Sequence, residues 1–430
     1  MKLAINGGEK LRTTPFPAYN TIDHEEEAAV LRVLRSGKLS TYLGTWHEDF
    51  LGGREVRALE EEWARFFGVK HAISVNSATS GLYAAVGALG INPGDEVIVS
   101  PYTMSASATA ILLYGGIPVF ADVEKEYFCL DPKSVEQLIT PKTKAIMAVD
   151  IFGQPADFNA LRALANKHNL KIIEDAAQAP YAALHGRYAG TLGDIGVFSL
   201  NYHKHIHTGE GGIVVTDDDE LAWKIQLIRN HAESVLSAKG YQSPQELNNM
   251  LGFNFRMTEV EASIARVQLT KLPHLIEERL TNVAYLENRL KNLPCLQIAP
   301  VRDGAQHVYY IHPLLFNTSS TPIHRNRFID AVKAELPPTL MREDSPVLLS
   351  YGYVKPLYLQ PLYQERICFG TYPFDRGNRT YTKGDCPICE DLHVNRLITH
   401  ELMRPGMSKQ DLDDVCEAFE KVWENKEELL

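Results

Sequence analysis

The segment AIMAVDIFGQPADFNALRALANKHNLKIIEDAAQA, residues 145–179, decides the fold class. Residues 145–152 and 171–176 are short apolar runs rich in β-branched side chains, as in buried strands. Between them, residues 158–168 have the apolar spacing of a helix. A strand, a helix and a second strand in this order predict two parallel strands joined by a crossover helix.

The same alternation extends in both directions along the chain. Five further strand candidates are HAISV (71–75), EVIVS (96–100), PVFADV (118–123), GVFSL (196–200) and GIVVTD (212–217). The seven runs together predict an α/β fold with a mostly parallel seven-stranded sheet that helices cover on both faces. A first helix is expected between the capping pair Asp23/Glu26 and Gly37, and a second over residues 55–67.

The last third of the chain has a different pattern, which predicts a smaller α+β domain. The expected boundary divides a large domain, residues 1–274, from a carboxyl-terminal domain, residues 275–430. The elements expected around and beyond this boundary are helices at 258–269 and 273–293, a strand at 308–315, a helix from His324, a loop-rich stretch at 338–391 and a helix from Ser408.

Composition excludes several classes of protein. The 430 residues include 43 Lys plus Arg and 54 Asp plus Glu, a net charge of −11 (43 − 54), without a basic block that would bind nucleic acid. We find no signal peptide and no run of eighteen apolar residues, so we expect no membrane span. The six cysteines are too scattered for a disulfide framework, so we expect a reduced, cytoplasmic protein.

Four segments lie at or near strand ends, where parallel sheets bind ligands. The first is NSATSGL, residues 76–82, which opens a helix. Its small hydroxyl residues and free backbone N–H groups suit a phosphate, although a helix cap by Ser77 or Thr79 is the plainer interpretation of this segment taken alone.

The second segment is KIIEDAAQA, residues 171–179. Asp175 ends a buried strand, where a carboxylate needs a partner such as the protonated ring nitrogen of a cofactor. Gln178, three residues further on, could reach a neighbouring polar substituent of the same ring. A helix-capping role for Asp175 is the alternative.

The third segment is FSLNYHKHIHTGEGG, residues 198–212. Lys204 follows a strand and lies among three histidines, and we expect neighbouring cations and partial burial to lower its pKa, as Schiff-base chemistry requires. A solvated loop lysine is the plainer interpretation. A metal site at His203, His205 and His207 is a further alternative, which we do not adopt.

The fourth segment is GFNFRMTEVEA, residues 252–262. Thr258 and Glu261 form a capping box, and Asn254 and Arg256 remain as a polar pair suited to an anion or simply to solvent. Elsewhere, the Cys386-x-x-Cys389 pair lacks a second pair at usable spacing, so we interpret it as structural and expect no metal site.

These segments, in this order, resemble the DegT/DnrJ/EryC1/StrS family, the sugar aminotransferases of the fold type I group that depend on pyridoxal 5'-phosphate (PLP). The resemblance spans nearly the whole chain. It rests on GGEKLRTTPFP, NSATSGL, DEVIVSPYT, PVFADV, FGQPAD, EDAAQA, GDIGVFS, GEGGIVVTD, GFNFRMTE and CPICEDLHVNRL.

The resemblance implies roles for particular residues. Lys204 is similar to the lysine that binds the cofactor covalently and then moves a proton, and it has the family's spacing to Ser199 and Glu210. Asp175 is similar to the partner of the pyridinium nitrogen, and Gln178 to the residue near the phenolic oxygen of the ring.

The remaining implied roles concern the phosphate and a second subunit. Ala78, Thr79 and Ser199 resemble the phosphate cradle. Asn254 is similar to a residue that reaches the phosphate of the neighbouring subunit's cofactor, which implies a homodimer with shared active sites.

The sequence departs from the family pattern at several points. Met104 stands where an aromatic ring usually stacks on the cofactor, so either its sulfur makes that contact or Tyr102 takes a share. Asn201 replaces a common histidine. Residues 342–385 and 41–54 are longer than the family norm, and we expect them to shape the substrate pocket.

The resemblance implies transfer of an amino group from L-glutamate or L-glutamine to a keto sugar, nucleotide-linked in the leading case, with pyridoxamine 5'-phosphate formed during turnover. Amination of a cyclitol ketone is the nearest variation. Dehydratases of the same family carry histidine where this chain has Lys204, which argues against that reaction. A non-catalytic regulator is the third alternative, and retention of Asp175, Ser199 and Lys204 argues against it.

Overall fold

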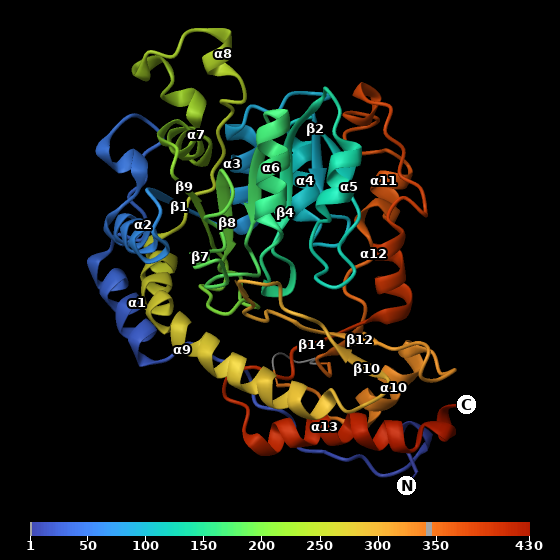
Figure 1. The fold of residues 1–430 in the computed structure, drawn as a ribbon. Coiled ribbons are helices and arrows are strands. Elements are labelled where there is room, and N and C mark those ends of the chain that lie inside the picture. The colour runs from blue at the N-terminus through green and yellow to red at the C-terminus, as the bar shows by residue number, and fades with distance from the viewer. Residues whose placement is uncertain (1, 341–345) are drawn as a thin grey trace.

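The computed structural model describes residues 2–340 and 346–430 (Figure 1). A large sheet with helices packed around it forms the upper part of the molecule in this view. A smaller sheet lies below it beside α9 and α13, and both chain ends lie at the bottom.

The large sheet has seven strands in the order β1-β9-β8-β5-β4-β2-β3. The pairs from β8 to β3 are parallel, whereas β9 runs antiparallel to both of its neighbours. The strands are β1 (His71–Val75), β2 (Glu96–Val99), β3 (Ile117–Phe120), β4 (Thr143–Val149), β5 (Lys171–Asp175), β8 (Ile195–Ser199) and β9 (Gly212–Thr216). The seven predicted strands and the mostly parallel sheet are confirmed.

The helices of this part of the chain lie around the sheet, and the four between residues 78 and 168 connect its successive strands. The helices are α1 (His24–Ser36), α2 (Arg54–Phe67), α3 (Ala78–Ala88), α4 (Ala106–Leu113), α5 (Pro132–Leu138), α6 (Phe158–His168), α7 (Asp219–Arg229) and α8 (Pro244–Leu247). As predicted, Asp23 and Glu26 form a capping box at the start of α1, and Gly37 ends the helix with φ +69°.

One long helix, α9 (Glu259–Leu290), replaces the two helices expected from the sequence. Pro273 lies inside it. A proline removes one backbone hydrogen bond and bends a helix, but here both flanking segments pack into hydrophobic clusters that keep the helix continuous. The expected domain boundary after residue 274 therefore falls inside a helix, and the division itself stays a prediction.

The second sheet has four antiparallel strands in the order β10-β12-β14-β13. A third, three-stranded sheet of short strands has the order β11-β6-β7. The strands are β6 (Ala183–Leu184), β7 (Arg187–Tyr188), β10 (Leu296–Ile298), β11 (Ala305–Gln306), β12 (His312–Phe316), β13 (Leu349–Tyr351) and β14 (Leu397–His400). The accompanying helices are α10 (Arg325–Glu335), α11 (Pro361–Gln364), α12 (Pro387–Asp391) and α13 (Lys409–Glu424).

The strand expected at residues 308–315 begins later than predicted, at His312. The preceding residues bind the segment after β4 instead: the Val308 N–H donates to the Gly153 carbonyl and the Ile311 N–H to the Phe152 carbonyl. An apolar pattern alone does not distinguish a strand from an extended linker of this kind.

The loop-rich stretch mostly covers the β3 edge of the large sheet. The Tyr381 hydroxyl donates to the Pro118 carbonyl at 2.9 Å, and Arg379 forms an ion pair with Glu96 at 2.9 Å. Residues 342–345 of the long segment lie outside the described part of the chain.

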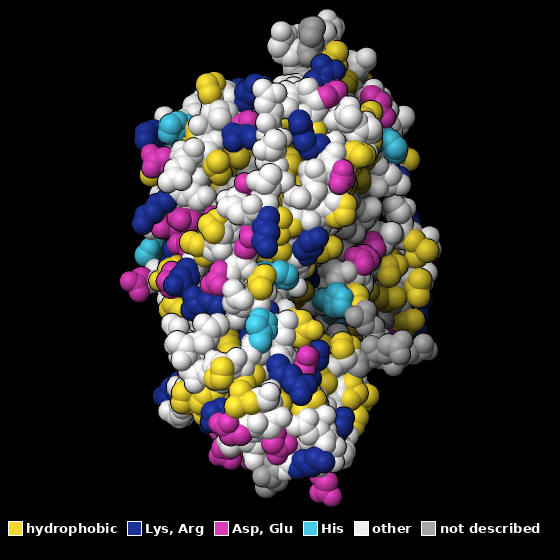
Figure 2. All heavy atoms as spheres, turned by 90° about the vertical axis from the view of Figure 1, so that its right-hand side faces the viewer, with side chains coloured by type: hydrophobic (Ala, Val, Ile, Leu, Met, Phe, Trp, Pro, Cys, Tyr) yellow, Lys and Arg dark blue, Asp and Glu magenta, His cyan; other side chains and the backbone are white. Residues whose placement is uncertain are grey.

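The surface mixes both signs of charge. On the face shown in Figure 2, acidic and basic side chains are interspersed. Within residues 2–340 and 346–430, no helix has the length and apolar character needed to cross a membrane.

Candidate active site

A cavity of about 400 Å³ lies where β1, β5 and β8 end. Seven of the eight predicted site residues line it: Ala78, Thr79, Met104, Asp175, Gln178, Ser199 and Lys204. They come from four separate segments of the chain, which the parallel sheet brings to one edge.

Lys204 lies in a turn after β8, where its N–H donates to the Asn201 carbonyl at 2.9 Å. Its ammonium lies 4.2 Å from the centre of the Tyr310 ring. Burial lowers the pKa of the Lys204 amine to about 8, and nearby Asp175 and Glu401 partly oppose this shift. Of the two causes expected for a lowered pKa, burial is the one that acts here, whereas the charged neighbours of Lys204 are carboxylates and not cations.

Asp175 ends β5 and is almost completely buried. Its carboxylate accepts a 2.7 Å hydrogen bond from the Ser107 hydroxyl and one from the Ala177 N–H at 3.2 Å. Burial raises the pKa of Asp175, while these donors and Lys204 lower it. A turn follows Asp175 instead of a helix, so the carboxylate does not cap one.

Gln178 is held in a defined orientation. Its Oε1 accepts a hydrogen bond from the Phe152 N–H at 2.7 Å, and its Nε2 donates to the Tyr353 hydroxyl at 3.2 Å. Because the oxygen faces a backbone donor, the amide cannot be turned over without losing a bond.

The amino end of α3 forms another wall. Ser77 caps the helix by accepting a hydrogen bond from the Ser80 N–H, so the capping interpretation is correct for Ser77. The first N–H groups of a helix have no partner within it, which leaves those of Ala78 and Thr79 available to an anion. A Cβ at Gly212 would lie 2.6 Å from the Ala78 nitrogen, so only glycine lets β9 approach this closely.

Met104 lines the cavity with 58% of its surface exposed. Tyr102, offered as an alternative ring, is fully buried and is not among the lining residues. Its hydroxyl instead contacts His393 Nδ1 at 3.2 Å and accepts the Tyr353 N–H at 2.7 Å.

Asn254 is the predicted site residue that the cavity does not include. Its side chain is exposed, and its carbonyl accepts a 3.3 Å hydrogen bond from Asn76, near the start of α3. Arg256 donates to Asn230 at 2.8 Å, so this guanidinium already has a protein partner.

A family model matches residues 20–420, almost the whole chain, and describes the DegT/DnrJ/EryC1/StrS aminotransferase family. The chain belongs to this family. It is a PLP-dependent aminotransferase, as the resemblance implied.

Individual members of the DegT/DnrJ/EryC1/StrS family are similar over most of their length. Spore coat polysaccharide biosynthesis protein SpsC of Bacillus subtilis is 33% identical, over 93% of this chain and 95% of that protein. L-glutamine:2-deoxy-scyllo-inosose aminotransferase of Streptomyces fradiae is 31% identical, over 98% of this chain and 97% of that protein. The crystal structure of DesI with its TDP-sugar product has 28% identity and a TM-score of 0.81, covering 99% of this chain and 97% of DesI.

The potential metal ligands of this family member are dispersed. His205 is buried and its Nε2 contacts the Val308 carbonyl at 3.0 Å, whereas the His207 ring accepts the Gly209 N–H. Cys386 and Cys389 are buried, and burial raises both thiol pKa values. Among the described residues, no group of three His, Cys, Asp or Glu side chains has the geometry of a metal site.

Three residues of this aminotransferase site escaped the sequence analysis. Ser107 binds Asp175, Tyr310 lies over Lys204, and Tyr353 binds Gln178. Ser107 lies in the PYTMSASA segment after a strand, which was a usable signal. The two tyrosines come from the carboxyl-terminal part, where only the tertiary fold brings them to the cavity.

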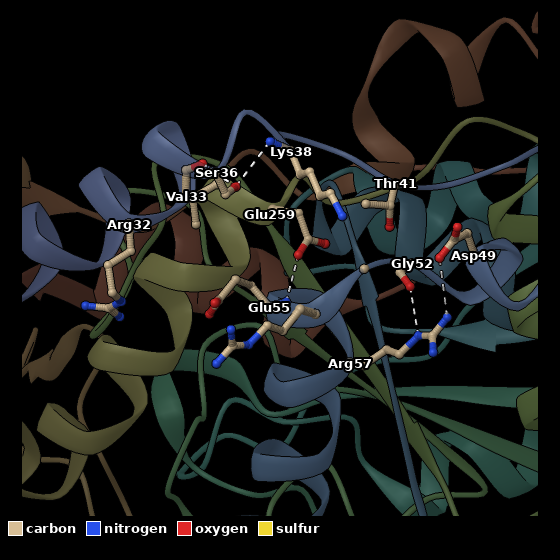
Figure 3. A pocket seen from close by; sticks show the side chains of 12 residues that line it. Arg32, Val33, Ser36, Lys38, Thr41, Asp49, Gly52, Glu55, Arg57 and Glu259 are labelled. Atoms are coloured by element: carbon tan, nitrogen blue, oxygen red, sulfur yellow. Dashed lines mark hydrogen bonds and ion pairs between the residues drawn. The ribbon is translucent and has the colours of Figure 1, made fainter.

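Of the two segments predicted to shape the substrate pocket, residues 342–385 and 41–54, only the first lines the cavity around Lys204 within the described part of the chain. Tyr353 is the described residue of 342–385 that lines the Lys204 cavity. Residues 41–54 line a separate cavity of about 550 Å³ at the start of α2, which Figure 3 shows beside Arg32, Lys38 and Glu259. In this chain, segment 41–54 does not contribute to the wall around Lys204.

Proposed function

We propose that this aminotransferase moves an amino group from L-glutamate or L-glutamine to a nucleotide-linked keto sugar, in amino-sugar biosynthesis. The observation that carries this proposal is the convergence of Lys204, Asp175, Gln178 and the amino end of α3 in one cavity. PLP, when bound, supplies an electron sink that makes carbon-bound protons of the substrate acidic.

The lining residues fit this cofactor from end to end. The free N–H groups at Ala78 and Thr79, with the Ser199 hydroxyl, suit its phosphate. Asp175 is buried, and Ser107 and Ala177 orient its carboxyl group, so it suits the protonated ring nitrogen. Gln178 would then bind the phenolic oxygen of the ring, and Met104 lines the same cavity.

Lys204 is the residue that holds and moves protons. With a pKa of about 8, roughly a tenth of its amine is neutral at pH 7, far more than for a solvated lysine. A neutral amine can bind the cofactor and can later accept or return the proton at the substrate carbon. The Tyr310 ring, whose centre lies 4.2 Å from the Lys204 nitrogen, favours the protonated form of the amine.

The relatives support a sugar acceptor. DesI is named with a TDP-sugar product, and SpsC is named for polysaccharide biosynthesis. A cyclitol ketone is the second candidate, because the L-glutamine:2-deoxy-scyllo-inosose aminotransferase resembles nearly the whole chain. Lys204, standing where the dehydratases carry histidine, favours amination over dehydration.

We also propose a homodimer, with Asn254 directed to the phosphate of the partner's cofactor. Its exposed side chain beside the start of α3 suits a contact with a second copy. The six cysteines are unpaired, which suits the reducing cytoplasm.

The test is the absorption spectrum of the purified protein with PLP, before and after addition of L-glutamate or L-glutamine without a ketone. A lysine-bound cofactor band that either donor bleaches supports the donor half of the reaction. Regeneration of the band by a nucleotide-linked keto sugar, and not by a cyclitol ketone, supports the acceptor. No band at all would refute the role of Lys204.

A further inference from the structure

Tyr353 reaches the cofactor cavity from the carboxyl-terminal part of the chain. It follows β13, in a turn where Gly352 has φ +73°. A side chain at Gly352 would meet the His393 ring at 2.8 Å, so both conformation and space require glycine there. This turn directs Tyr353 away from the four-stranded sheet and toward Gln178.

The Tyr353 ring is fixed on several sides. Its backbone N–H donates to the Tyr102 hydroxyl at 2.7 Å. Its ring packs edge-to-face with Tyr102 and with Phe152, at centroid distances of 6.0 and 5.3 Å. The hydroxyl therefore has a defined position without any contribution from a ligand.

The direction of the hydrogen bond between Gln178 and Tyr353 follows from the Gln178 amide. Because Oε1 accepts from the Phe152 N–H, Nε2 is the atom that faces Tyr353 and donates to its oxygen. The hydroxyl proton of Tyr353 is thus not used in this bond. No described residue accepts it, and Tyr353 lines the cavity with Lys204 and Asp175.

We propose that Tyr353 is a cofactor-binding residue whose hydroxyl donates to the phenolic oxygen of the PLP ring, beside Gln178. This inference rests on the proposed function, which directs Gln178 to that oxygen. Burial raises the pKa of Tyr353 to about 12, so the hydroxyl remains a donor throughout the working range of pH.

The donated bond has a chemical consequence at Lys204. The phenolic oxygen carries negative charge and holds the proton of the nitrogen that joins Lys204 to the cofactor. A second donor at this oxygen competes for its charge, which weakens its hold on that proton. Tyr353 therefore lowers the pKa of the joining nitrogen, and its loss raises that pKa.

The experiment is a pH titration of the bound cofactor's absorbance in the PLP-loaded protein. For Tyr353→Phe, we expect the midpoint to rise by about one pH unit, the effect of one lost hydrogen bond to a charged oxygen. Tyr363→Phe is the matched control, because this buried tyrosine lies away from the cavity and its hydroxyl has no partner. Its midpoint should equal that of the wild type.

Two further results complete the test. Tyr353→His keeps a ring N–H donor and is expected to recover part of the shift, and it also serves if Tyr353→Phe does not fold. An unchanged midpoint in folded Tyr353 variants would overturn this inference alone, provided that the wild type still forms the band and L-glutamate or L-glutamine bleaches it. Absence of a titrating band in the wild type would overturn the proposed function as well.

Discussion

The hydroxyl of Tyr19 donates a 2.5 Å hydrogen bond to the carbonyl of His205, the residue directly after Lys204. On its other side, the His205 ring donates from Nε2 to the Val308 carbonyl at 3.0 Å. Burial keeps the His205 pKa well below its ordinary value, so this ring is neutral. The amino-terminal arm, the described residues before α1 that include Tyr19, and the linker before β12 thus both bind the turn that contains Lys204.

Removing the hydrogen bond from Tyr19 to the His205 carbonyl should lower the catalytic rate more than it lowers the stability of the fold. For Tyr19→Phe, we expect about 1 kcal/mol less stability and a roughly three- to tenfold lower kcat, because one hydrogen bond that positions the turn is lost. PLP affinity should change less, since Tyr19 does not line the cavity. Urea unfolding, steady-state kinetics and a PLP titration measure these quantities. A Tyr19→Phe protein with wild-type kcat would show that the arm does not position Lys204.

Lys204→Ala should fold and bind PLP without covalent attachment, and it should not complete transamination. The reason is that no other described side chain with an amine lines the cavity. Lys144→Ala, which removes an exposed lysine of β4, is the matched control and should behave as the wild type. Borohydride trapping of the cofactor, followed by mass spectrometry, distinguishes the two variants. Wild-type turnover by Lys204→Ala would refute the assignment.

The pKa of Lys204 predicts how covalent PLP binding depends on pH. The neutral amine is the reactive form, and with a pKa of about 8 its fraction rises from roughly a tenth at pH 7 to roughly nine-tenths at pH 9. The initial rate of reconstitution of the apoprotein should therefore rise about tenfold over this range and then level off. A rate that continues to rise above about pH 10 would indicate an ordinary, solvated lysine.

The close packing of β9 on α3 should control phosphate binding. Gly212→Ala places a Cβ 2.6 Å from the Ala78 nitrogen and 2.7 Å from the Ser77 carbonyl carbon, which must displace the amino end of α3. We expect roughly tenfold weaker PLP binding in an equilibrium titration, the scale of one lost hydrogen bond to a charged group. Gly44→Ala, whose Cβ would meet only the His231 ring at 3.7 Å, should bind PLP normally.

A buried histidine pair predicts sensitivity to acid. The Leu402 N–H donates to His400 Nδ1, so His400 donates from Nε2 to His312 Nδ1 at 2.8 Å, and His312 donates onward to Glu287 at 3.2 Å. Protonation of His400 at Nδ1 would make this atom a donor that faces the Leu402 N–H, which is also a donor. Burial and His312 accordingly keep the His400 pKa well below its ordinary value.

The sign of the effect follows from this lowered pKa. A group with a folded pKa below its unfolded value contributes stability above about pH 6.5 and loses it as the pH falls. The free energy of unfolding should fall between pH 7 and pH 5 in the wild type. In His400→Gln, which removes the titrating ring, we expect this fall to be smaller by about 1–2 kcal/mol. Exposed His24→Gln is the control, and its decline should match the wild type. Equal declines in all three proteins would refute the role of the pair.

Local patterns were sufficient to predict most elements of the seven-stranded sheet and its helices. The strand 171–175 and the helix 158–168 have strong periodicity and clear caps, so their bounds follow from local interactions. The helix break expected at Pro273 was wrong because packing on both sides of the proline outweighs its local preference. Local sequence could not show that balance.

The site residues also fall into two groups, those that local sequence predicts and those that depend on the tertiary fold. Asp175, Ser199 and Lys204 follow strands of one parallel sheet, so the sheet's geometry makes their convergence predictable. Tyr310 and Tyr353 come from the last third of the chain. The position of Tyr353 depends on contacts with Phe152, Tyr102 and Gln178 that span more than 150 residues of sequence, and Tyr310 packs on Lys204 and His205 across more than 100. Asn254 follows its expected loop but lies outside the cavity of a single chain.

The unbroken helix α9 connects distant parts of the molecule. Near one end, Glu259 accepts the Glu55 N–H at the start of α2, and toward the other, Leu286 and Leu290 pack into the core beside the four-stranded sheet. Arg279, between them, donates to the Tyr309 carbonyl next to Tyr310. One continuous helix therefore joins the start of α2, the segment before Tyr310 and the core beside the four-stranded sheet, so the relative positions of these three regions are set by a single element.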